Sequence, residues 1–307
     1  MNQAVLFDRY GAPDALYATD LPMPVPGPGE VVVRYSAIGV NPIDWKILGG
    51  DLRAHVPMEL PGGRLGVEAA GVVVETGPGV RRFRVGDPVV RHGRPGTYQE
   101  YEAVPATQEA DELTPWPARF SAEQAAVLPV AAGTAYSALR QVQLHPGERL
   151  LVHGASGGVG LAVVQLALLT GAAEVVGTAS ARHHGLLRRL GATPVEYGDG
   201  LLERLAEHGS FDASVDCAGG PQPTATSVSL VNVPGRRVTV ADFQAPERGV
   251  PFLEHVPLEL ASTLDLIGHS PFELPVAARF PLAEAGRALE LGMRGGLGGK
   301  IVLLPGR

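Results

Sequence analysis

Short apolar runs alternate with turn residues over the first third of the chain. Residues 29–40, 70–80 and 84–90 are rich in valine, and glycine or proline bounds or interrupts each run. Such runs, separated by turn signals, are typical of antiparallel strands. We therefore expect a largely antiparallel β domain from residue 1 to about residue 110.

The pattern changes after about residue 145, where continuous apolar segments alternate with helical patterns. Strands buried on both faces of a parallel sheet have this continuous apolar character, and the helices between them cover the two faces. The pattern predicts an α/β domain with a doubly wound parallel sheet. The expected strands lie in RLLVHG (149–154), EVVGTA (174–179), FDASVDCA (211–218), RRVTVA (236–241) and LDLIGHS (264–270).

Three further segments connect or close these regions. Residues 121–148 form a predicted helical connection that ends at Pro146 and Gly147, because this residue pair cannot continue a helix. Residues 281–293 have the pattern of an amphipathic helix, and residues 299–305 that of a closing strand. The whole chain is thus expected to be an α/β protein with a β-rich domain and a parallel-sheet domain.

Composition and charge narrow the class of partner. The chain has 307 residues, of which 45% are hydrophobic and 19% charged, as in a folded globular protein. Its formal net charge of −7 is spread along the chain without basic blocks. This disfavours nucleic acid and a membrane surface as partners. We expect a small-molecule substrate.

The sequence favours a cytoplasmic protein. The first dozen residues contain charges and turn residues and lack the apolar segment of a signal peptide. Gln165, Gly171 and Glu174 interrupt the longest apolar stretch, so it does not predict a membrane span. The single cysteine, Cys217, excludes an internal disulfide and a cysteine-rich zinc site.

Residues 153–160, HGASGGVG, follow an apolar strand and precede a helical pattern. Residues 154–158 match G-x-S-x-G, the turn that presents a nucleophilic serine in α/β-hydrolases. Ala155, Gly157 and Gly160 match the dinucleotide fingerprint with alanine in the first glycine position. Both motifs need a strand, a tight turn and a helix, so the local context does not decide between them.

The rest of the chain favours the dinucleotide interpretation. Only the β-rich domain and one helical connection precede Ser156, and no HGGG-type oxyanion loop lies upstream. Asp212, Asp216, His255 and His269 could complete a triad, but common residues satisfy that order easily. A plain strand-to-helix turn without a ligand is the third interpretation.

The residues at the end of the next predicted strand indicate which dinucleotide would bind. A ribose-reading residue is expected about 20 positions after the fingerprint, and Thr178, Ser180 and Arg182 stand there instead of an acid. A hydroxyl and a guanidinium offer charge-assisted hydrogen bonds to a 2′-phosphate. The segment therefore favours NADPH over NADH. The alternative is that Arg182 is a solvated residue at a helix start.

Several segments spread over nearly the whole chain carry a family resemblance. They are GVNPIDWK (39–46), GVEAAGVVVETGPGVRRFRVGDPVV (66–90), AAVLPVAAGTAYSAL (125–139), GERLLVHGASGGVGLAVVQLA (147–167), RLGATPVEY (189–197) and GKIVLLP (299–305). Together they resemble the medium-chain dehydrogenase/reductase superfamily, specifically its zinc-free quinone oxidoreductase (zeta-crystallin-like) branch. The resemblance implies a GroES-like catalytic domain over 1–124 and 271–307 and a Rossmann domain over 125–270.

The resemblance also indicates that no metal is bound. Zinc-dependent members carry a cysteine and a histidine where this chain has Asn41 and Val67. Neither residue is a good zinc ligand. The cysteine-rich structural zinc lobe of those members is missing too.

The resemblance assigns roles to individual residues. It places the pyrophosphate of NADPH at Ser156, Gly157, Gly158, Val159 and Gly160, and the adenosine phosphate at Ser180, Arg182 and Tyr197. It places Val240 and Ala241 near the nicotinamide, and it has Lys300 close the cofactor-binding site.

Asn41 and Thr134 are the polar groups that the resemblance places near the nicotinamide, with Asp44 orienting the Asn41 loop. Without a metal, hydrogen-bond donors must stabilise the developing enolate or phenolate of an enone or quinone. Asn41, Pro42 and Asp44 also form a typical helix start, so Asn41 could be a helix cap, a catalytic donor, or both.

We therefore expect an NADPH-dependent quinone or enone oxidoreductase. An enoyl-thioester reductase of a biosynthetic pathway and a non-catalytic NADPH-binding protein are the alternatives, because fold does not fix function. Relatives pair through their last Rossmann strand, expected here at 263–269, so a homodimer is predicted.

Overall fold

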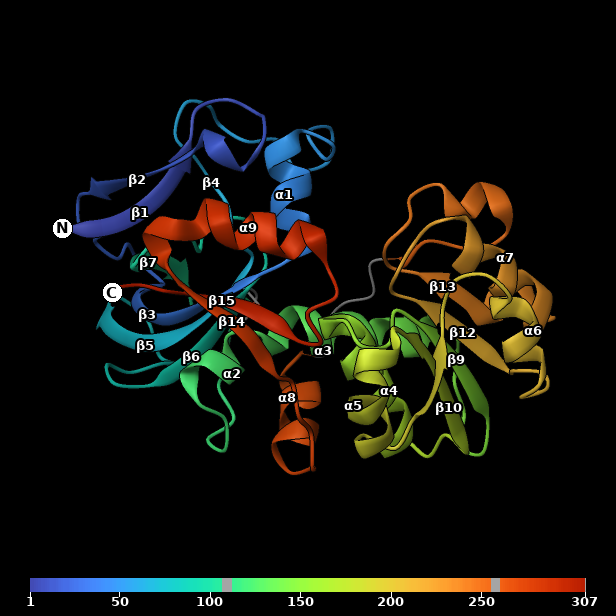
Figure 1. Ribbon diagram of the computed structural model, residues 1–307. Helices are drawn as coiled ribbons and strands as arrows, with labels where there is room; N and C mark the ends of the chain where they lie inside the picture. The colour runs from blue at the N-terminus through green and yellow to red at the C-terminus, as the bar shows by residue number, and fades with distance from the viewer. Residues whose placement is uncertain (107–111, 255–259, 307) are drawn as a thin grey trace. The chain divides into compact units, whose positions relative to one another are not determined.

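The computed structural model describes residues 1–106, 112–254 and 260–306, which form two compact units (Figure 1). The first unit comprises Met1–Val130, Pro275–Gly295 and Lys300–Arg307, and the second comprises Ala131–Leu274 and Gly296–Gly299. The boundaries predicted from the sequence, at 124/125 and 270/271, lie N-terminal to the corresponding boundaries of these units.

Seven strands form the main sheet in the described part of the first unit, in the order β14-β15-β3-β5-β6-β8, and β7 pairs with β3. Neighbours are antiparallel except β14 and β15, which are parallel. The predicted antiparallel β domain is therefore confirmed. The strands are β3 (Glu30–Val40), β5 (Glu68–Thr76), β6 (Pro88–His92), β7 (Tyr101–Pro105), β8 (Leu113–Pro115), β14 (Val276–Pro281) and β15 (Lys300–Leu304).

A smaller sheet and a few helices complete the first unit. β1 lies between β2 and β4 in the small sheet, and α9 packs against α1, β14 and β15. The buried face of α9 carries Ala285, Ala288 and Leu289, which have helical spacing. The elements are β1 (Asn2–Phe7), β2 (Leu16–Leu21), β4 (Gly63–Arg64), α1 (Pro42–Gly49), α2 (Ala122–Ala125), α9 (Ala285–Arg294), η1 (Pro13–Ala15) and η5 (Leu282–Glu284).

The second unit contains a parallel sheet of five strands within the described residues, in the order β11-β10-β9-β12-β13. The chain builds outward from β9 to one side and then returns to the other side. The order therefore reverses between β9 and β12, and ligands of open α/β sheets bind at such a switch point. The strands are β9 (Arg149–His153), β10 (Glu174–Ala179), β11 (Thr193–Glu196), β12 (Ala213–Asp216) and β13 (Arg237–Thr239).

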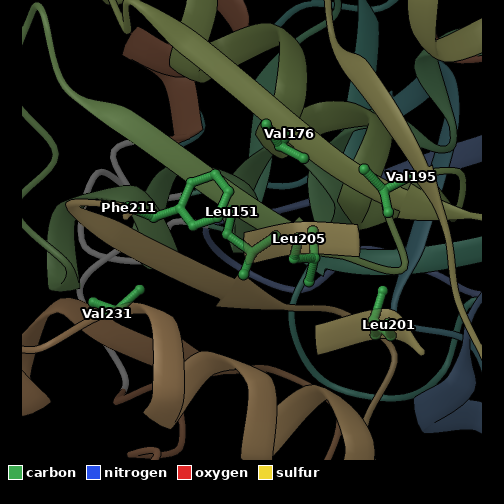
Figure 2. Close-up of a cluster of buried hydrophobic side chains, with 7 residues drawn as sticks. All are labelled: Leu151, Val176, Val195, Leu201, Leu205, Phe211 and Val231. Carbon is green, nitrogen blue, oxygen red and sulfur yellow. The ribbon is translucent and has the colours of Figure 1, made fainter. Parts of the chain in front are cut away.

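Helices cover this parallel sheet. A cluster of buried apolar side chains joins the strands to α6 and to the segment that follows α7 (Figure 2); its members are Leu151, Val176, Val195, Leu201, Leu205, Phe211 and Val231. The helices that contact the strands of this sheet are α4 (Gly158–Leu169), α5 (His184–Arg189), α6 (Leu201–Ala206) and α7 (Pro221–Leu230). The second unit also contains α3 (Leu128–Gln141), which starts in the first unit, α8 (Leu260–Gly268), and the short turns η2 (Ala181–His183), η3 (Pro234–Arg236) and η4 (Ala245–Arg248). The sequence pattern did not predict β11 and α6.

The strand predicted within residues 263–270 is wrong, because this segment forms α8 and the turn after it. The buried residues of α8 are Leu260, Thr263, Leu264 and Ile267, at positions i, i+3, i+4 and i+7. This spacing places them on one face of a helix, whereas a strand would bury alternate residues. The strand edge on which the predicted homodimer depended is therefore absent from residues 260–270.

No helix within the described ranges combines the length and the apolar character needed to cross a membrane.

Candidate cofactor site and active site

The glycine-rich turn lies between β9 and α4, at the switch point of the parallel sheet. Gly154 has a φ of +66°, which favours glycine, and Gly157 precedes the helix in an extended conformation. No side chain caps the start of α4 in the described structure. The first-turn N–H groups, which include those of Gly158 and Val159, are thus available to an anion at the positive end of the helix dipole.

Gly160 fits the close packing that a dinucleotide turn requires. A β-carbon at this position would lie 2.3 Å from the carbonyl oxygen of Gly154 and 2.7 Å from the Cα of Ala155. At Gly177 of β10, a β-carbon would lie 2.6 Å from that of Ala155. Helix and strands therefore meet at the turn only because both positions are glycine. This geometry fits a nicotinamide dinucleotide.

The residues around Ser156 argue against the hydrolase interpretation. The neighbouring His153 is fully buried, and burial lowers the pKa of its imidazole to about 3, so the ring is neutral. Its Nδ1 and Nε2 lie 3.4 Å from Thr178 Oγ1 and 3.1 Å from Thr226 Oγ1. His153 therefore links β9, β10 and α7 and is not placed as a base for Ser156.

The other members of the possible triad are also engaged elsewhere or lie outside the described residues. Asp216 accepts hydrogen bonds from the backbone N–H groups of Ala218 and Gly219, and Asp212 from that of Arg149. His269 faces Asp265 on α8. His255 lies outside the described residues.

The segment after β10 presents the residues predicted to bind the adenosine phosphate. Arg182 is exposed and donates a hydrogen bond to the carbonyl oxygen of Gly296 at 2.7 Å. Ser180 Oγ lies 3.2 Å from Nδ1 of His183. Because Arg182 bonds here to a carbonyl and not to a carboxylate, its charge is available to an anion.

Tyr197 lies on a loop after β11 whose backbone is held by side-chain hydrogen bonds, and 58% of the surface of Tyr197 is exposed. Arg204 donates hydrogen bonds to the backbone carbonyls of Glu196, Gly198 and Asp199. Gln222 bonds both the N–H and the carbonyl of Gly198. These contacts hold the backbone of the loop and leave the Tyr197 ring accessible.

Val240 and Ala241 follow β13 in a loop that is tied to the end of β12. The hydroxyl of Thr239 donates to Asp216 at 2.9 Å and accepts from the N–H of Ala241 at 3.2 Å. The N–H of Val240 donates to the carbonyl oxygen of Asp216 at 2.9 Å. The two strand ends therefore support the half-buried Val240 and Ala241 together.

Asn41 stands at the start of α1 in the first unit, as the helix-cap interpretation predicts. Its N–H donates to Asp44 Oδ2 at 2.7 Å, and Pro42 is the first helical residue. Its side chain also forms a capping box with Asp44, and the amide contacts two charged groups: Nδ2 donates to Glu68 Oε1 at 2.8 Å, and Oδ1 accepts from Lys300. Asn41 therefore both starts the helix and contacts the ion pair of Glu68 and Lys300.

Asp44 is fully buried and holds three elements together. It accepts hydrogen bonds from the N–H groups of Asn41 and Gly66 and from the hydroxyl of Tyr98. Burial raises the pKa of Asp44 to about 7, although these three donors favour the ionised form. These contacts agree with the predicted role of Asp44 in orienting the Asn41 loop.

Lys300 and Glu68 form a buried ion pair beside Asn41. Lys300 Nζ lies 2.9 Å from Glu68 Oε1, and the second carboxylate oxygen accepts from the N–H of Val130 at 2.8 Å. Glu68 is fully buried, and Lys300 is 6% exposed. The structure thus brings together two predicted residues, Asn41 and Lys300, which contact each other and Glu68. Glu68 was not predicted as a site residue, although it lies within the motif GVEAAG.

Thr134, the other predicted catalytic residue, is half-buried on α3 and belongs to the second unit, whereas Asn41 and Lys300 belong to the first.

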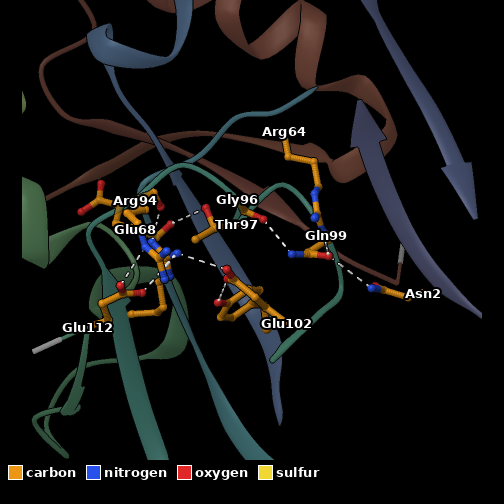
Figure 3. Close-up of polar contacts among 11 residues, drawn as sticks. Asn2, Arg64, Glu68, Arg94, Gly96, Thr97, Gln99, Glu102 and Glu112 are labelled. Carbon is orange, nitrogen blue, oxygen red and sulfur yellow. Dashed lines mark hydrogen bonds and ion pairs between the residues drawn. The ribbon is translucent and has the colours of Figure 1, made fainter. Parts of the chain in front are cut away.

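A second polar network, also missed from the sequence, supports this part of the first unit (Figure 3). The hydroxyl of Thr97 donates to the backbone carbonyl of Glu68 at 3.3 Å, next to the Tyr98 that contacts Asp44. The buried Arg91 pairs with Glu102 at 3.1 Å. Because arginine is rarely buried without a partner, this ion pair accounts for the burial of Arg91 on β6, the neighbour of β5.

The residues around Asn41 do not fit a zinc ion. Among the described residues, no group of three or more histidine, cysteine, aspartate or glutamate side chains is placed to hold a metal. The ammonium group of Lys300 occupies the acceptor atoms of Asn41 and Glu68. A second cation at the same oxygens would meet electrostatic repulsion.

Comparisons with known proteins agree with this architecture. Residues 27–117 match the alcohol dehydrogenase GroES-like domain, and residues 158–263 match the zinc-binding dehydrogenase family. The chain is 31% identical to the chloroplastic quinone-oxidoreductase QR1 of Triphysaria versicolor over 99% of both chains. It is 31% identical to the quinone oxidoreductase of Pseudomonas aeruginosa, over 99% of this chain and 100% of the relative.

A solved structure, the quinone oxidoreductase from Coxiella burnetii, has a TM-score of 0.82 and 28% identity and covers 99% of both chains. A GroES-like domain joined to a Rossmann domain with a dinucleotide turn defines an oxidoreductase that uses a nicotinamide cofactor. The chain belongs to the medium-chain dehydrogenase/reductase superfamily, in its quinone oxidoreductase branch. The predicted fold class and family are confirmed.

Proposed function

We propose that this protein is an NADPH-dependent, zinc-independent reductase of quinones or α,β-unsaturated carbonyl compounds. The similarity to quinone oxidoreductases over 99% of the chain carries this proposal. The site residues support it, because they offer a dinucleotide turn in one unit and a polarised amide in the other.

The cofactor contacts that we propose lie at the carboxyl ends of the parallel strands. The backbone from Ser156 to Gly160 binds the pyrophosphate through the first turn of α4. Ser180, Arg182 and Tyr197 hold the adenosine phosphate, and Val240 and Ala241 border the nicotinamide. Bound NADPH supplies the hydride.

The preference for NADPH depends on Arg182. Its guanidinium has no carboxylate partner within the described residues, so it can form a charge-assisted hydrogen bond to a 2′-phosphate. An acid at this place would instead accept from a ribose hydroxyl and repel the phosphate. This distinction supports NADPH over NADH.

Asn41 is the hydrogen-bond donor that we propose for the substrate. Hydride addition to a quinone or enone places negative charge on the carbonyl oxygen, and an oriented N–H stabilises that charge. Thr134 is the second polar residue proposed for the site. Asp44 orients Asn41 by accepting its backbone N–H.

The proposal is tested by mixing the purified protein with NADPH or NADH and following cofactor absorbance with quinones, enones and enoyl thioesters. We expect quinone or enone turnover with NADPH, and no loss of rate after EDTA treatment. Turnover confined to enoyl thioesters would establish that alternative instead. Cofactor binding without turnover would indicate a non-catalytic NADPH-binding protein. The variant S156A should keep turnover within about threefold of the wild type. The proposed contacts to the pyrophosphate come from backbone N–H groups of this turn and not from the Ser156 hydroxyl.

The homodimer and the cytoplasmic location stay predictions. Since residues 260–268 are helical, a dimer cannot use the strand edge that the sequence predicted. Light scattering would measure the mass directly, and a monomer would remove the homodimer prediction.

A further inference from the structure

The Asn41 amide is the centre of a buried polar cluster built from four segments. These are the end of β3 with Asn41, the start of β5 with Glu68, the start of β15 with Lys300, and the start of α3 with the Val130 N–H. Glu68 is separated from Lys300 by 232 positions along the chain. The proposed function uses Asn41 but has given no role to Glu68 or to its contact with Lys300.

The cluster fixes which way round the Asn41 amide lies. A carboxylate can only accept and an ammonium can only donate. Nδ2 must therefore face Glu68 and Oδ1 must face Lys300, as the structure has them. The reversed amide would place its oxygen against the carboxylate and its NH₂ against the ammonium, so both contacts would become repulsive.

The carboxylate of Glu68 is itself held at both oxygens. Oε2 accepts from Val130 at 2.8 Å, and Oε1 accepts from Asn41 and Lys300 at 2.8 and 2.9 Å. Gly39 packs against it so closely that a β-carbon there would lie 2.3 Å from Oε1. Glu68 is thus a rigid support for the amide.

The contacts among Asn41, Glu68 and Lys300 determine which of the two Nδ2 hydrogens of Asn41 is left without a partner in this cluster. Lys300 Nζ touches both Asn41 Oδ1 and Glu68 Oε1, so the three groups form a ring. The Nδ2 hydrogen that faces Glu68 must then be the one on the side of the amide oxygen. The other Nδ2 hydrogen points away from the ion pair and is not used by these contacts.

We infer that Glu68 and Lys300 are positioning residues that present this second Asn41 N–H to the carbonyl oxygen of the substrate. The inference rests on the proposed function, in which Asn41 is the donor. Lys300 and Glu68 contact each other and both contact Asn41, so the ion pair orients and polarises the amide. A donor held in place beforehand costs no reorganisation during the reaction.

Turnover with NADPH and a quinone tests the inference by a double-mutant cycle. K300M/E68Q removes both charges together, which avoids leaving one charge buried alone. We expect N41A and K300M/E68Q each to lower kcat by about 10- to 100-fold, because misplacing a donor costs about as much as removing it. The combined N41A/K300M/E68Q variant should be no slower than N41A by more than about twofold. The dissociation constant of NADPH, measured by fluorescence, should stay unchanged in all of them. A loss of NADPH affinity in K300M/E68Q alone would overturn the inference, because Lys300 would then bind the cofactor, as the resemblance implies.

Two further variants separate positioning from general support of the fold. K300R keeps a donor beside both oxygens and should retain more activity than K300M/E68Q. E102Q weakens a second buried ion pair of this unit, between Glu102 and Arg91, and should leave kcat unchanged. Losses that multiply in the combined variant would overturn the inference, because Lys300 and Glu68 would then act independently of Asn41. A kcat of N41A equal to that of the wild type would overturn the inference as well. The proposed quinone reductase function would not be affected by that result.

A second measurement needs no turnover. The chain has three asparagines, Asn2, Asn41 and Asn232, so ¹⁵N-asparagine labelling gives three side-chain NH₂ signals. In K300M/E68Q we expect the Asn41 signals, identified by their loss in N41A, to shift while those of Asn2 stay in place. Unchanged Asn41 signals would show that the ion pair does not position the amide. If the wild-type protein reduced no substrate, the proposed function would fail and this measurement would still decide the orientation.

Discussion

Gly39 and Glu68 share a space that holds only one side chain. A β-carbon at residue 39 would lie 2.3 Å from Glu68 Oε1 and 2.6 Å from its Cγ. Gly39 lies on β3 two residues before Asn41, and Glu68 lies on the neighbouring β5. The glycine is therefore needed for the carboxylate that contacts both Asn41 and Lys300.

The variant G39A should displace Glu68 and, with it, the Asn41 amide. We expect kcat to fall by about tenfold or more, because small displacements of a donor have large effects on rate. Overpacking should lower the free energy of unfolding by about 1–3 kcal/mol. Steady-state kinetics and thermal melting measure the two effects.

G11A is the matched control for G39A in the same unit, because its β-carbon would have only an ordinary contact of 3.7 Å with Ala15. If G39A reduced stability but left kcat equal to that of G11A, the carboxylate would have no role in turnover.

Replacing Arg182 should affect the two nicotinamide cofactors differently. A charge-assisted hydrogen bond to the 2′-phosphate contributes about 1.5–3 kcal/mol, so R182A should weaken NADPH binding by about 10- to 100-fold. NADH lacks the phosphate and should bind about equally well to both proteins. Fluorescence titration gives both dissociation constants.

Arg188 provides the control for this comparison, since it is an exposed arginine on the adjacent α5. R188A should leave NADPH binding within about twofold of the wild type. Equal losses for NADPH and NADH in R182A would mean that Arg182 does not read the phosphate.

Local signals predicted much of this fold, and their physical basis explains where they failed. The glycine turn at 154–160 and the valine-rich strands depend on residues that are neighbours along the chain, so they can be predicted from the sequence. The spacing of Leu260, Leu264 and Ile267 also indicates a helix at α8. The apolar character of this segment and its place in the chain favoured a strand instead, and that prediction was wrong.

The contacts around Asn41 could not be predicted in the same way. Glu68 and Lys300 lie 232 positions apart, and no periodicity links residues on separate strands. The resemblance identified Asn41 and Lys300 as site residues but did not connect them. Arg91 was missed for a related reason, since arginine is ordinarily a surface residue and its burial depends on distant carboxylates.

Gly160 should tolerate no side chain. In G160A the new β-carbon would lie 2.3 Å from the Gly154 carbonyl oxygen, and backbone atoms cannot move aside as a flexible side chain can. We expect the free energy of unfolding to fall by about 2 kcal/mol or more and NADPH binding to be lost or severely weakened. Denaturant unfolding and fluorescence titration test these two effects.

G185A shows what the same substitution does in open space. Gly185 lies on α5, and a β-carbon there would meet nothing within 4 Å. Alanine favours a helix over glycine, so stability should rise by roughly 0.5 kcal/mol and NADPH binding should be retained. A G160A protein as stable as G185A would contradict the tight packing at the turn.

Asp44 should make stability depend on pH. Burial raises its pKa from 3.8 to about 7 in the folded protein, so the folded state holds this proton more tightly than the unfolded state. The resulting stabilisation is complete below about pH 4 and is lost as the pH rises through about 7. One such group changes the free energy of unfolding by at most about 1.4 kcal/mol per pH unit across this window.

D44N removes the titration while keeping the size of the side chain. Its free energy of unfolding, measured with urea from pH 4 to pH 8, should therefore fall less steeply with rising pH than that of the wild type. The exposed Asp51 offers a control in the same unit, and D51N should follow the wild-type slope. If D44N and D51N had the same slope, Asp44 would be ionised across the whole range, and its three hydrogen-bond donors would outweigh the effect of burial.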